Sequence, residues 1–167
     1  MHRRLFLALA LLAPMSPLAA QDAPRTVFVV RHAEKGPENP DPSLTDGGKR
    51  RAAALARTLT DAHVTALFAS EFKRTQETLA PLGQAAGVTT TVISAGKMDD
   101  LISALRALPA GSTAVVASHS NLVNLIVERL SGQKMTMLTD ADYDRLVVVT
   151  VEGDGRGRAL VLRYGEP

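Results

Sequence analysis

The sequence predicts an α/β fold, a three-layer sandwich whose mostly parallel central sheet is flanked by helices. Short runs rich in β-branched residues alternate with longer segments of helical periodicity, the pattern of strands joined by crossover helices. The last two runs are separated only by the glycine-rich segment 153–157, which predicts a hairpin. We therefore expect one antiparallel strand at an edge of the sheet.

Six strands are expected along the chain. In order they are 26–30, 64–69, 89–93, 113–117, 146–151 and 159–162. The fourth run contains only small and β-branched residues, which is typical of a strand covered on both faces.

Four helices are expected between the strands. The first begins at the N-cap Thr45, the second and third span 72–86 and 99–108, and the fourth follows the strand at 113–117. The apolar stripe of the fourth helix is Leu122, Leu125, Ile126 and Leu130. Pro81 lies inside the second helix and is expected to kink it, and Gly87 is expected to end it.

The N-terminal segment has the features of a secretory signal peptide. A basic start is followed by the apolar run 5–13 and by small residues just before Gln21. The apolar run is about half of the ~20 residues that a membrane-spanning helix needs. We therefore expect residues 1–20 to be cleaved without leaving a stable membrane anchor, residues 21–167 to form a single domain, and the protein to be periplasmic or secreted.

Composition narrows the classes of function. Loss of Arg3 and Arg4 with the signal would leave 17 basic residues against 17 acidic ones, so nothing favours nucleic acid as a partner. The chain has no cysteine, which excludes disulfides and phosphatase chemistry based on a cysteine nucleophile. Residues 21–167 hold three histidines and no His-x-His pair, so a metal site is not expected.

Residues with chemical potential follow three of the expected strands. These segments are 31–34, 70–75 and 118–121. Because the carboxyl ends of parallel strands share one edge of a sheet, where ligands bind, the three segments are expected to meet. The meeting would bring together Arg31, His32, Arg74 and His119.

These four residue types suit phosphate chemistry. Arginine binds phosphate through bidentate, charge-assisted hydrogen bonds. A neutral imidazole can serve as a nucleophile, and a protonated one can offset the charge that builds up during transfer. The sequence therefore predicts a phosphate site with His32 as the candidate nucleophile.

The motifs Arg31-His32-Ala33-Glu34, 44–48, 70–75 and 118–121 resemble the histidine phosphatase superfamily, the phosphoglycerate-mutase-like group, and among it the small bacterial members without a cap. The resemblance covers about residues 26–151. It implies that His32 becomes phosphorylated, that Arg31, Arg74 and His119 bind the phosphoryl group, and that no metal or other cofactor takes part.

The sequence departs from the family pattern at two places. Ala33 replaces the usual glycine, as in many small members. Glu38 stands where mutases have an asparagine, with Asn39 one place later, which disfavours a mutase.

The acid that protonates the leaving group is less clearly encoded. Mutase-like members supply a glutamate from the region that here reads 95–100, which contains only Asp99 and Asp100. Asp99 is the preferred candidate, with a helix-capping role as its alternative. Glu34 is a second candidate, with an ion pair at the pocket rim as its alternative.

The sequence thus predicts an exported, metal-independent phosphatase that hydrolyses small phosphorylated substrates, phosphomonoesters, through a phosphohistidine on His32. One alternative is a protein phosphohistidine phosphatase, which export disfavours because phosphorelay proteins are cytoplasmic. Another is a phospholigand-binding protein of the same fold without turnover. His63 is expected to be a surface or boundary residue.

Overall fold

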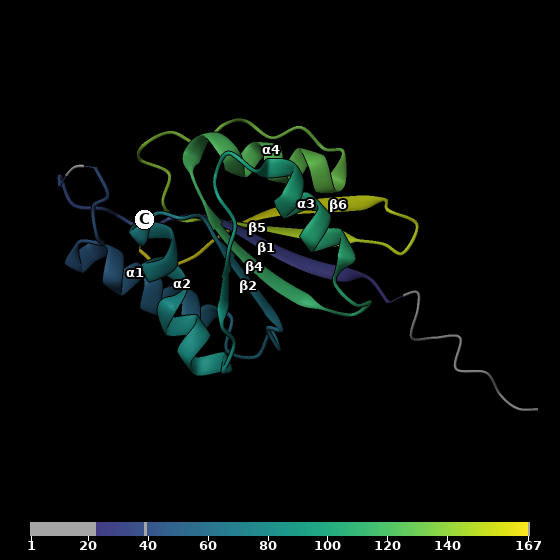
Figure 1. Ribbon diagram of the computed structural model, residues 1–167, viewed down its shortest axis with the longest axis horizontal. Coiled ribbons are helices and arrows are strands. Elements are labelled where there is room, and N and C mark those ends of the chain that lie inside the picture. The colour runs from purple at the N-terminus through teal and green to yellow at the C-terminus, as the bar shows by residue number, and fades with distance from the viewer. Residues whose placement is uncertain (1–22, 39, 167) are drawn as a thin grey trace, which may run out of the picture.

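The computed structural model describes residues 23–38 and 40–166, which form a six-stranded sheet between two pairs of helices (Figure 1). In chain order the elements are β1 Arg25–Arg31, α1 Asp46–Thr58, β2 Ala66–Ala69, α2 Lys73–Ala86, β3 Thr90–Val92, α3 Met98–Ala107, β4 Thr113–Ser118, α4 Ser120–Ser131, β5 Arg145–Val151 and β6 Gly157–Arg163. Helices α1 and α2 cover one face of the sheet, and α3 and α4 cover the other. The predicted α/β class and its three layers are confirmed.

The strands lie in the order β3-β2-β4-β1-β5-β6. Strands β3, β2, β4 and β1 pair in parallel, whereas β5 runs antiparallel to both β1 and β6. The predicted hairpin is confirmed, and its second strand, β6, is an edge strand that pairs antiparallel with β5. The first strand of the hairpin, β5, lies inside the sheet because it also pairs with β1.

Local sequence signals set where helix α1 begins and where helix α2 ends. The hydroxyl of Thr45 accepts a hydrogen bond from the N–H of Gly48 at 3.1 Å, so the predicted N-cap of α1 is confirmed. Helix α2 continues through Pro81 and ends at Gly87, whose φ of 67° is left-handed.

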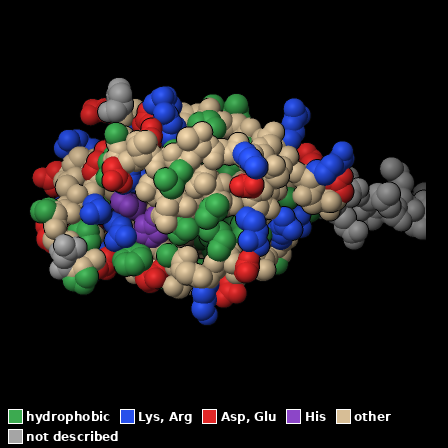
Figure 2. Space-filling model, turned by 90° about the horizontal axis from the view of Figure 1, so that it is seen from above, with side chains coloured by type: hydrophobic (Ala, Val, Ile, Leu, Met, Phe, Trp, Pro, Cys, Tyr) green, Lys and Arg blue, Asp and Glu red, His purple; other side chains and the backbone are tan. Residues whose placement is uncertain are grey.

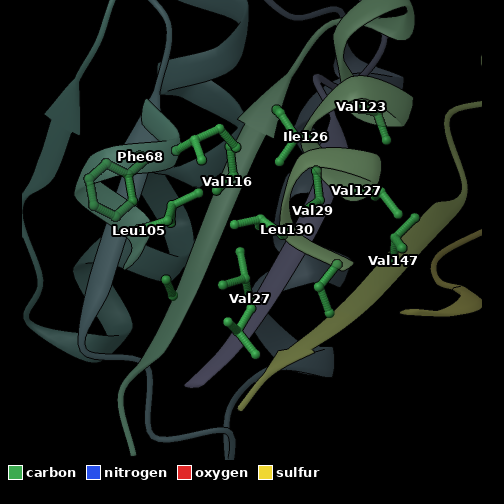
Figure 3. Packing of buried hydrophobic residues seen from close by; sticks show 14 of the residues in the cluster. Val27, Val29, Phe68, Leu105, Val116, Val123, Ile126, Val127, Leu130 and Val147 are labelled. Carbon is green, nitrogen blue, oxygen red and sulfur yellow. The ribbon is translucent and has the colours of Figure 1, made fainter. Parts of the chain in front are cut away.

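Alternation along the central strands places one core on each face of the sheet. In β1 and β4, Val29 and Val116 face α3 and α4, whereas Val30 and Val115 face α1 and α2. Figure 3 shows the first of these cores, in which valines of the sheet meet Ile126 and Leu130 of α4. All four valines are at most 1 % exposed, so strands β1 and β4 are anchored by packing on both faces of the sheet.

Two residues of the predicted α4 stripe are not part of the core, and Leu122 is one of them because it is only partly buried. Leu125 is 42 % exposed, and the buried residues of α4 are Val123, Ile126, Val127 and Leu130. These positions are spaced i, i+3, i+4, i+7, which is the spacing of one helical face, and Leu125 falls outside it.

The expected signal peptide, residues 1–20, lies outside the described residues. In the part of the chain that the structure describes, no helix has the length and apolar character needed to cross a membrane.

Candidate active site

Three neighbouring strands deliver the predicted residues to one edge. Arg31 ends β1 opposite Ser118, the last residue of β4, and the N–H of His32 donates to the carbonyl of Ser118 at 2.8 Å. His119 follows β4 directly, and Arg74 lies in the first turn of α2, just beyond β2. The structure thus brings together the four residues that the strand pattern selected.

A solvent-open pocket of about 500 Å³ lies at this edge. Its polar lining side chains are Arg31, His32, Lys35, Arg74, His119, Ser120, Asn121 and Asp140. Figure 2 shows histidine side chains beside Lys and Arg side chains, next to a hollow surrounded by hydrophobic side chains. The pocket therefore combines positive charge with hydrogen-bond donors, as an anionic ligand requires.

His32 is fixed in one tautomer by its own backbone neighbour. Its Nδ1 lies 2.8 Å from the carbonyl of Ala33, and because a carbonyl only accepts, Nδ1 carries the proton. The lone pair of a neutral ring is then on Nε2. Burial lowers the pKa of His32 to about 4, an effect that the Ala33 hydrogen bond opposes and the charge of Arg31 reinforces. At neutral pH His32 is therefore an uncharged potential nucleophile.

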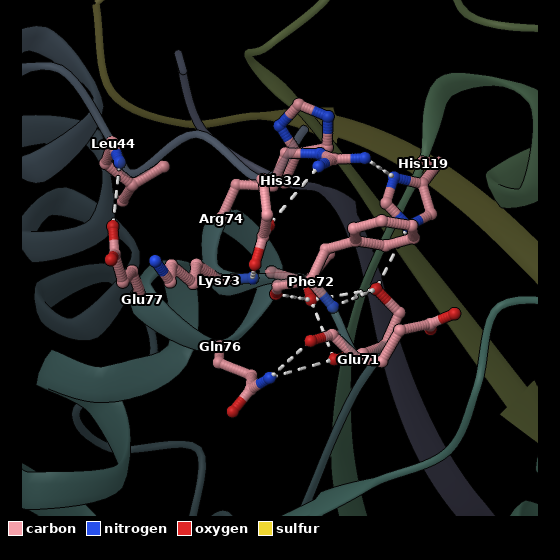
Figure 4. A network of polar contacts seen from close by, with 12 residues as sticks. His32, Leu44, Glu71, Phe72, Lys73, Arg74, Gln76, Glu77 and His119 are labelled. Carbon is pink, nitrogen blue, oxygen red and sulfur yellow. Dashed lines mark hydrogen bonds and ion pairs between the residues drawn. The ribbon is translucent and has the colours of Figure 1, made fainter. Parts of the chain in front are cut away.

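His119 lies beside it, with the two ring centroids 5.5 Å apart. Its Nε2 is 3.0 Å from the hydroxyl of Ser70, and its Nδ1 is 3.5 Å from Nη2 of Arg74 (Figure 4). Because the guanidinium only donates, Nδ1 accepts and Nε2–H points to Ser70. Burial, followed by the charge of Arg74, lowers the pKa of His119 to about 4, although Glu71 raises it. His119 is therefore uncharged at neutral pH, whereas the sequence predicts a protonated histidine. A bound dianion would favour the protonated form of His119.

Each of the two arginines stacks on an aromatic ring. The guanidinium carbon of Arg74 lies 4.3 Å from the ring centroid of Phe72, and that of Arg31 lies 4.0 Å from the ring centroid of Tyr143. The Nε atoms of both arginines are buried and have no hydrogen-bond partner among the described residues. Such orphan donors suit an oxyanion, because an unpaired buried N–H is costly.

The glycine-containing motif at 44–48 supports the loop that carries His32. Thr45 N–H donates to the carbonyl of Glu34 at 2.9 Å. A Cβ at position 48 would lie 2.2 Å from that carbonyl oxygen, so only glycine permits this approach. The N–H of Ala33 donates to the hydroxyl of Thr78 at 2.9 Å, which ties the loop to α2 as well.

The structure does not bring the candidate acids of the sequence to the pocket. Asp99 is in the first turn of α3, and its carboxylate pairs with Arg129 of α4 at 2.6 Å. Asp100 pairs with Lys97 at 3.7 Å. Neither residue is among those that line the pocket.

Glu34 has the ion-pair role that was its alternative. Its Oε1 accepts from Arg51 at 2.8 Å. Burial by itself would raise the pKa of Glu34, but the hydrogen bond and charge of Arg51 hold it below the ordinary value. Glu38 is exposed and outside the pocket lining, Asn39 is not described, and His63 is exposed with a φ of 49°.

Several residues in or beside the pocket are not predicted by the sequence. Asn121 lines the pocket two positions after His119, and Phe72 contacts both Arg74 and His119. Both lie inside segments that the strand-end rule had already selected, so their positions were available as a signal. Asp140 and Tyr143 come from a loop without any such pattern.

The described residues contain no candidate metal-binding cluster. Among the described residues, no group of three or more His, Asp or Glu side chains is arranged to hold a metal ion.

Comparison with known proteins agrees with the geometry of the pocket. The model of the histidine phosphatase superfamily (branch 1) matches residues 27–95, which include Arg31, His32 and Arg74. Over residues 27–95 the chain is similar to the histidine phosphatase superfamily, and solved structures of that superfamily share its fold. No protein with curated functional information matches the sequence significantly.

Solved structures of histidine phosphatases share the fold over most of the chain. The protein histidine phosphatase SixA complexed with tungstate is 23 % identical, with a TM-score of 0.71 over 83 % of this chain and 96 % of that one. A putative phosphohistidine phosphatase SixA from Nakamurella multipartitia is 22 % identical, with a TM-score of 0.61 over 87 % and 97 %. A mycobacterial glucosyl-3-phosphoglycerate phosphatase is 13 % identical, with a TM-score of 0.62 over 85 % and 100 %.

Proposed function

We propose that this protein hydrolyses small phosphomonoesters through a phosphohistidine on His32, without a metal ion. The observation that carries the proposal is the hydrogen bond from Nδ1 of His32 to the carbonyl of Ala33. It leaves the lone pair on Nε2 in a pocket that also contains Arg31, Arg74 and His119.

The reaction has two steps. Nε2 of His32 forms a bond to phosphorus while the ester P–O bond breaks, and water then cleaves the N–P bond. Arg31 and Arg74 offset the negative charge on the transferred group, and the dianion favours a proton on His119. Because these side chains supply the positive charge, the mechanism needs no metal.

Turnover of an aryl phosphate in the presence of EDTA tests this proposal. His32→Asn is expected to abolish turnover and the acid-labile phosphoprotein, whereas His63→Asn is expected to retain both. His63 is a matched control because it is an exposed histidine outside the pocket, and asparagine tolerates its left-handed backbone. Loss of wild-type turnover with EDTA would contradict the metal-free mechanism. Ligand binding without turnover would favour the non-catalytic alternative.

A protein phosphohistidine phosphatase is the second candidate. The open pocket, which the side chain of another protein could enter, favours it, as does the similarity to SixA. A phosphohistidine substrate releases an imidazole, which needs less help from an acid than an alkoxide does. A kcat/KM at least about 100-fold higher for a phosphohistidine protein than for aryl and alkyl phosphates would select this candidate.

We also propose that the chain is exported and cleaved near Ala20, which rests on the signal-peptide pattern of residues 1–20. Cell fractionation followed by N-terminal sequencing tests it. A mature protein that begins near Gln21 in the periplasm or medium is expected. A full-length protein in the cytoplasm would contradict it.

A further inference from the structure

A carboxylate reaches the phosphate site from the segment 139–143, between α4 and β5. Among the residues that the structure describes, Asp140 is the one carboxylate in the pocket lining. Its Oδ1 lies 3.2 Å from Nη2 of Arg31. The side chain of Asp140 is 97 % exposed and that of Arg31 only 4 %, so a solvated carboxylate meets a buried guanidinium at the pocket.

The neighbours of Asp140 hold the segment in place. Asp142 accepts hydrogen bonds from the N–H and the hydroxyl of Thr139 at 2.8 and 2.6 Å. The carbonyl of Thr139 accepts from Nη1 of Arg31 at 2.8 Å, and the hydroxyl of Tyr143 accepts from its Nη2 at 3.3 Å. Asp140 therefore has a defined position over the pocket in spite of its exposure.

We propose that Asp140 protonates the oxygen of the leaving group, an assignment that rests on the phosphatase function proposed above. An alkoxide is a poor leaving group, and a carboxylic acid beside the scissile oxygen supplies the proton it needs. A phosphate that binds Arg31 takes over the guanidinium from Asp140. The carboxyl then lies beside a dianion, and neighbouring like charges favour a retained proton. Substrate binding thus converts an ion-paired carboxylate into an acid.

Other carboxylates near the pocket have structural partners. Asp41 lies 3.8 Å from Nη1 of Arg74 but accepts the N–H of Lys73 at the start of α2. Asp99 and Glu34 pair with arginines away from the lining, as described above. Asp41 is therefore the matched control for Asp140, because each carboxylate pairs with one of the two pocket arginines and only Asp140 lines the pocket.

The protons and electron pairs balance over the two steps. In the first, Nε2 of His32 bonds to phosphorus, the P–O bond breaks, and the leaving oxygen takes the proton of Asp140 to become an alcohol. In the second, the oxygen of water bonds to phosphorus while the Asp140 carboxylate takes its proton. The N–P bond breaks, and its electron pair returns to Nε2.

The test compares leaving groups, because an acid matters only where the leaving oxygen is basic. The rate of phosphoryl transfer to His32 is measured in single turnovers with nitrophenyl phosphate and with an alkyl phosphate. For Asp140→Asn we expect a loss of about 100-fold or more with the alkyl ester and less than about threefold with the nitrophenyl ester. For Asp41→Asn we expect any loss to be equal for the two esters.

Equal losses for the two esters in Asp140→Asn, or no loss, would overturn the assignment while leaving the proposed phosphatase function intact. Absence of phosphoryl transfer from both esters in the wild-type protein would contradict the proposed function, and the role of Asp140 would fall with it. Circular dichroism and the thermal midpoint show whether each variant is folded.

Discussion

Two regions of the molecule meet on Arg31, and they are built differently. At the ends of β1 and β4, a backbone hydrogen bond from His32 to Ser118 continues the strand pairing into the site. The segment 139–143 pairs with no strand that the structure describes. Asp142 holds Thr139 through its side chain and its backbone N–H, and Tyr143 stacks on Arg31. The strand ends therefore fix the proposed phosphate site, and the segment adds groups around it.

Burial separates the two regions further. The side chain of Arg31 and the ring of His32 are almost wholly buried, whereas Asp140 is exposed. Groups on the sheet are held in the low-dielectric interior, where they interact strongly with an anion. A group on the exposed segment can change its partner when a ligand arrives. In the proposed mechanism, the sheet edge therefore binds the phosphoryl group, and the exposed loop changes its contacts when the ligand binds.

The largest effect is expected from Arg31→Lys compared with Arg51→Lys. Both arginines are buried, but Arg31 lines the pocket, whereas Arg51 binds Glu34 and the carbonyls of Tyr164 and Glu166. Loss of the planar fork at Arg31 is expected to lower kcat/KM about 100- to 1,000-fold.

Arg51→Lys is instead expected to lower the free energy of unfolding by about 1–3 kcal/mol, because buried acceptors lose their donors. Its kcat/KM should stay within a few-fold of wild type. Steady-state kinetics and urea titration measure the two effects. Equal losses of kcat/KM in both variants would show that the sheet edge does not distinguish the two arginines.

The sequence predicted the sheet-edge half of the site well. His32 and His119 each follow the last residue of a strand directly, so their position relative to the sheet depends only on strand direction. Arg74 follows β2 after a short loop and lies in the first turn of a helix, which restricts it almost as much. Backbone pairing, which has a clear sequence signal, thus carries these residues to the site.

The loop half was not predictable in the same way. Asp140 reaches the pocket because its segment contacts Arg31, more than a hundred residues away in sequence, and no periodicity encodes that contact. Asp99 was favoured from its position after a loop, but Arg129 on the neighbouring helix α4 engages it. The position of β5 inside the sheet likewise depends on its pairing with β1, which the hairpin signal does not contain.

A second effect should appear as a dependence of stability on pH. Both His32 and His119 have a pKa of about 4 in the folded protein, against 6.5 for an ordinary histidine. Between these values the unfolded chain binds more protons than the folded one. The free energy of unfolding should therefore fall as the pH falls from about 6.5 to about 4.

Urea midpoints at several pH values across this window measure the dependence. A double variant, His32→Gln with His119→Gln, lacks both groups and is expected to show a shallower slope. Identical slopes in the variant and the wild type would contradict neutral, buried histidines at the sheet edge.

The smallest effect is expected from loosening the loop while the sheet edge stays intact. Asp142→Ala removes the acceptor for the N–H and hydroxyl of Thr139, so the segment that contacts Arg31 loses two of its internal hydrogen bonds. We expect kcat/KM to fall several-fold, while His32 still becomes phosphorylated. Asp154→Ala is the matched control, because Asp154 accepts the N–H of Arg156 in the turn between β5 and β6, outside the pocket lining. If steady-state kinetics show the same kcat/KM for Asp142→Ala and Asp154→Ala, contacts with Arg31 alone position the segment.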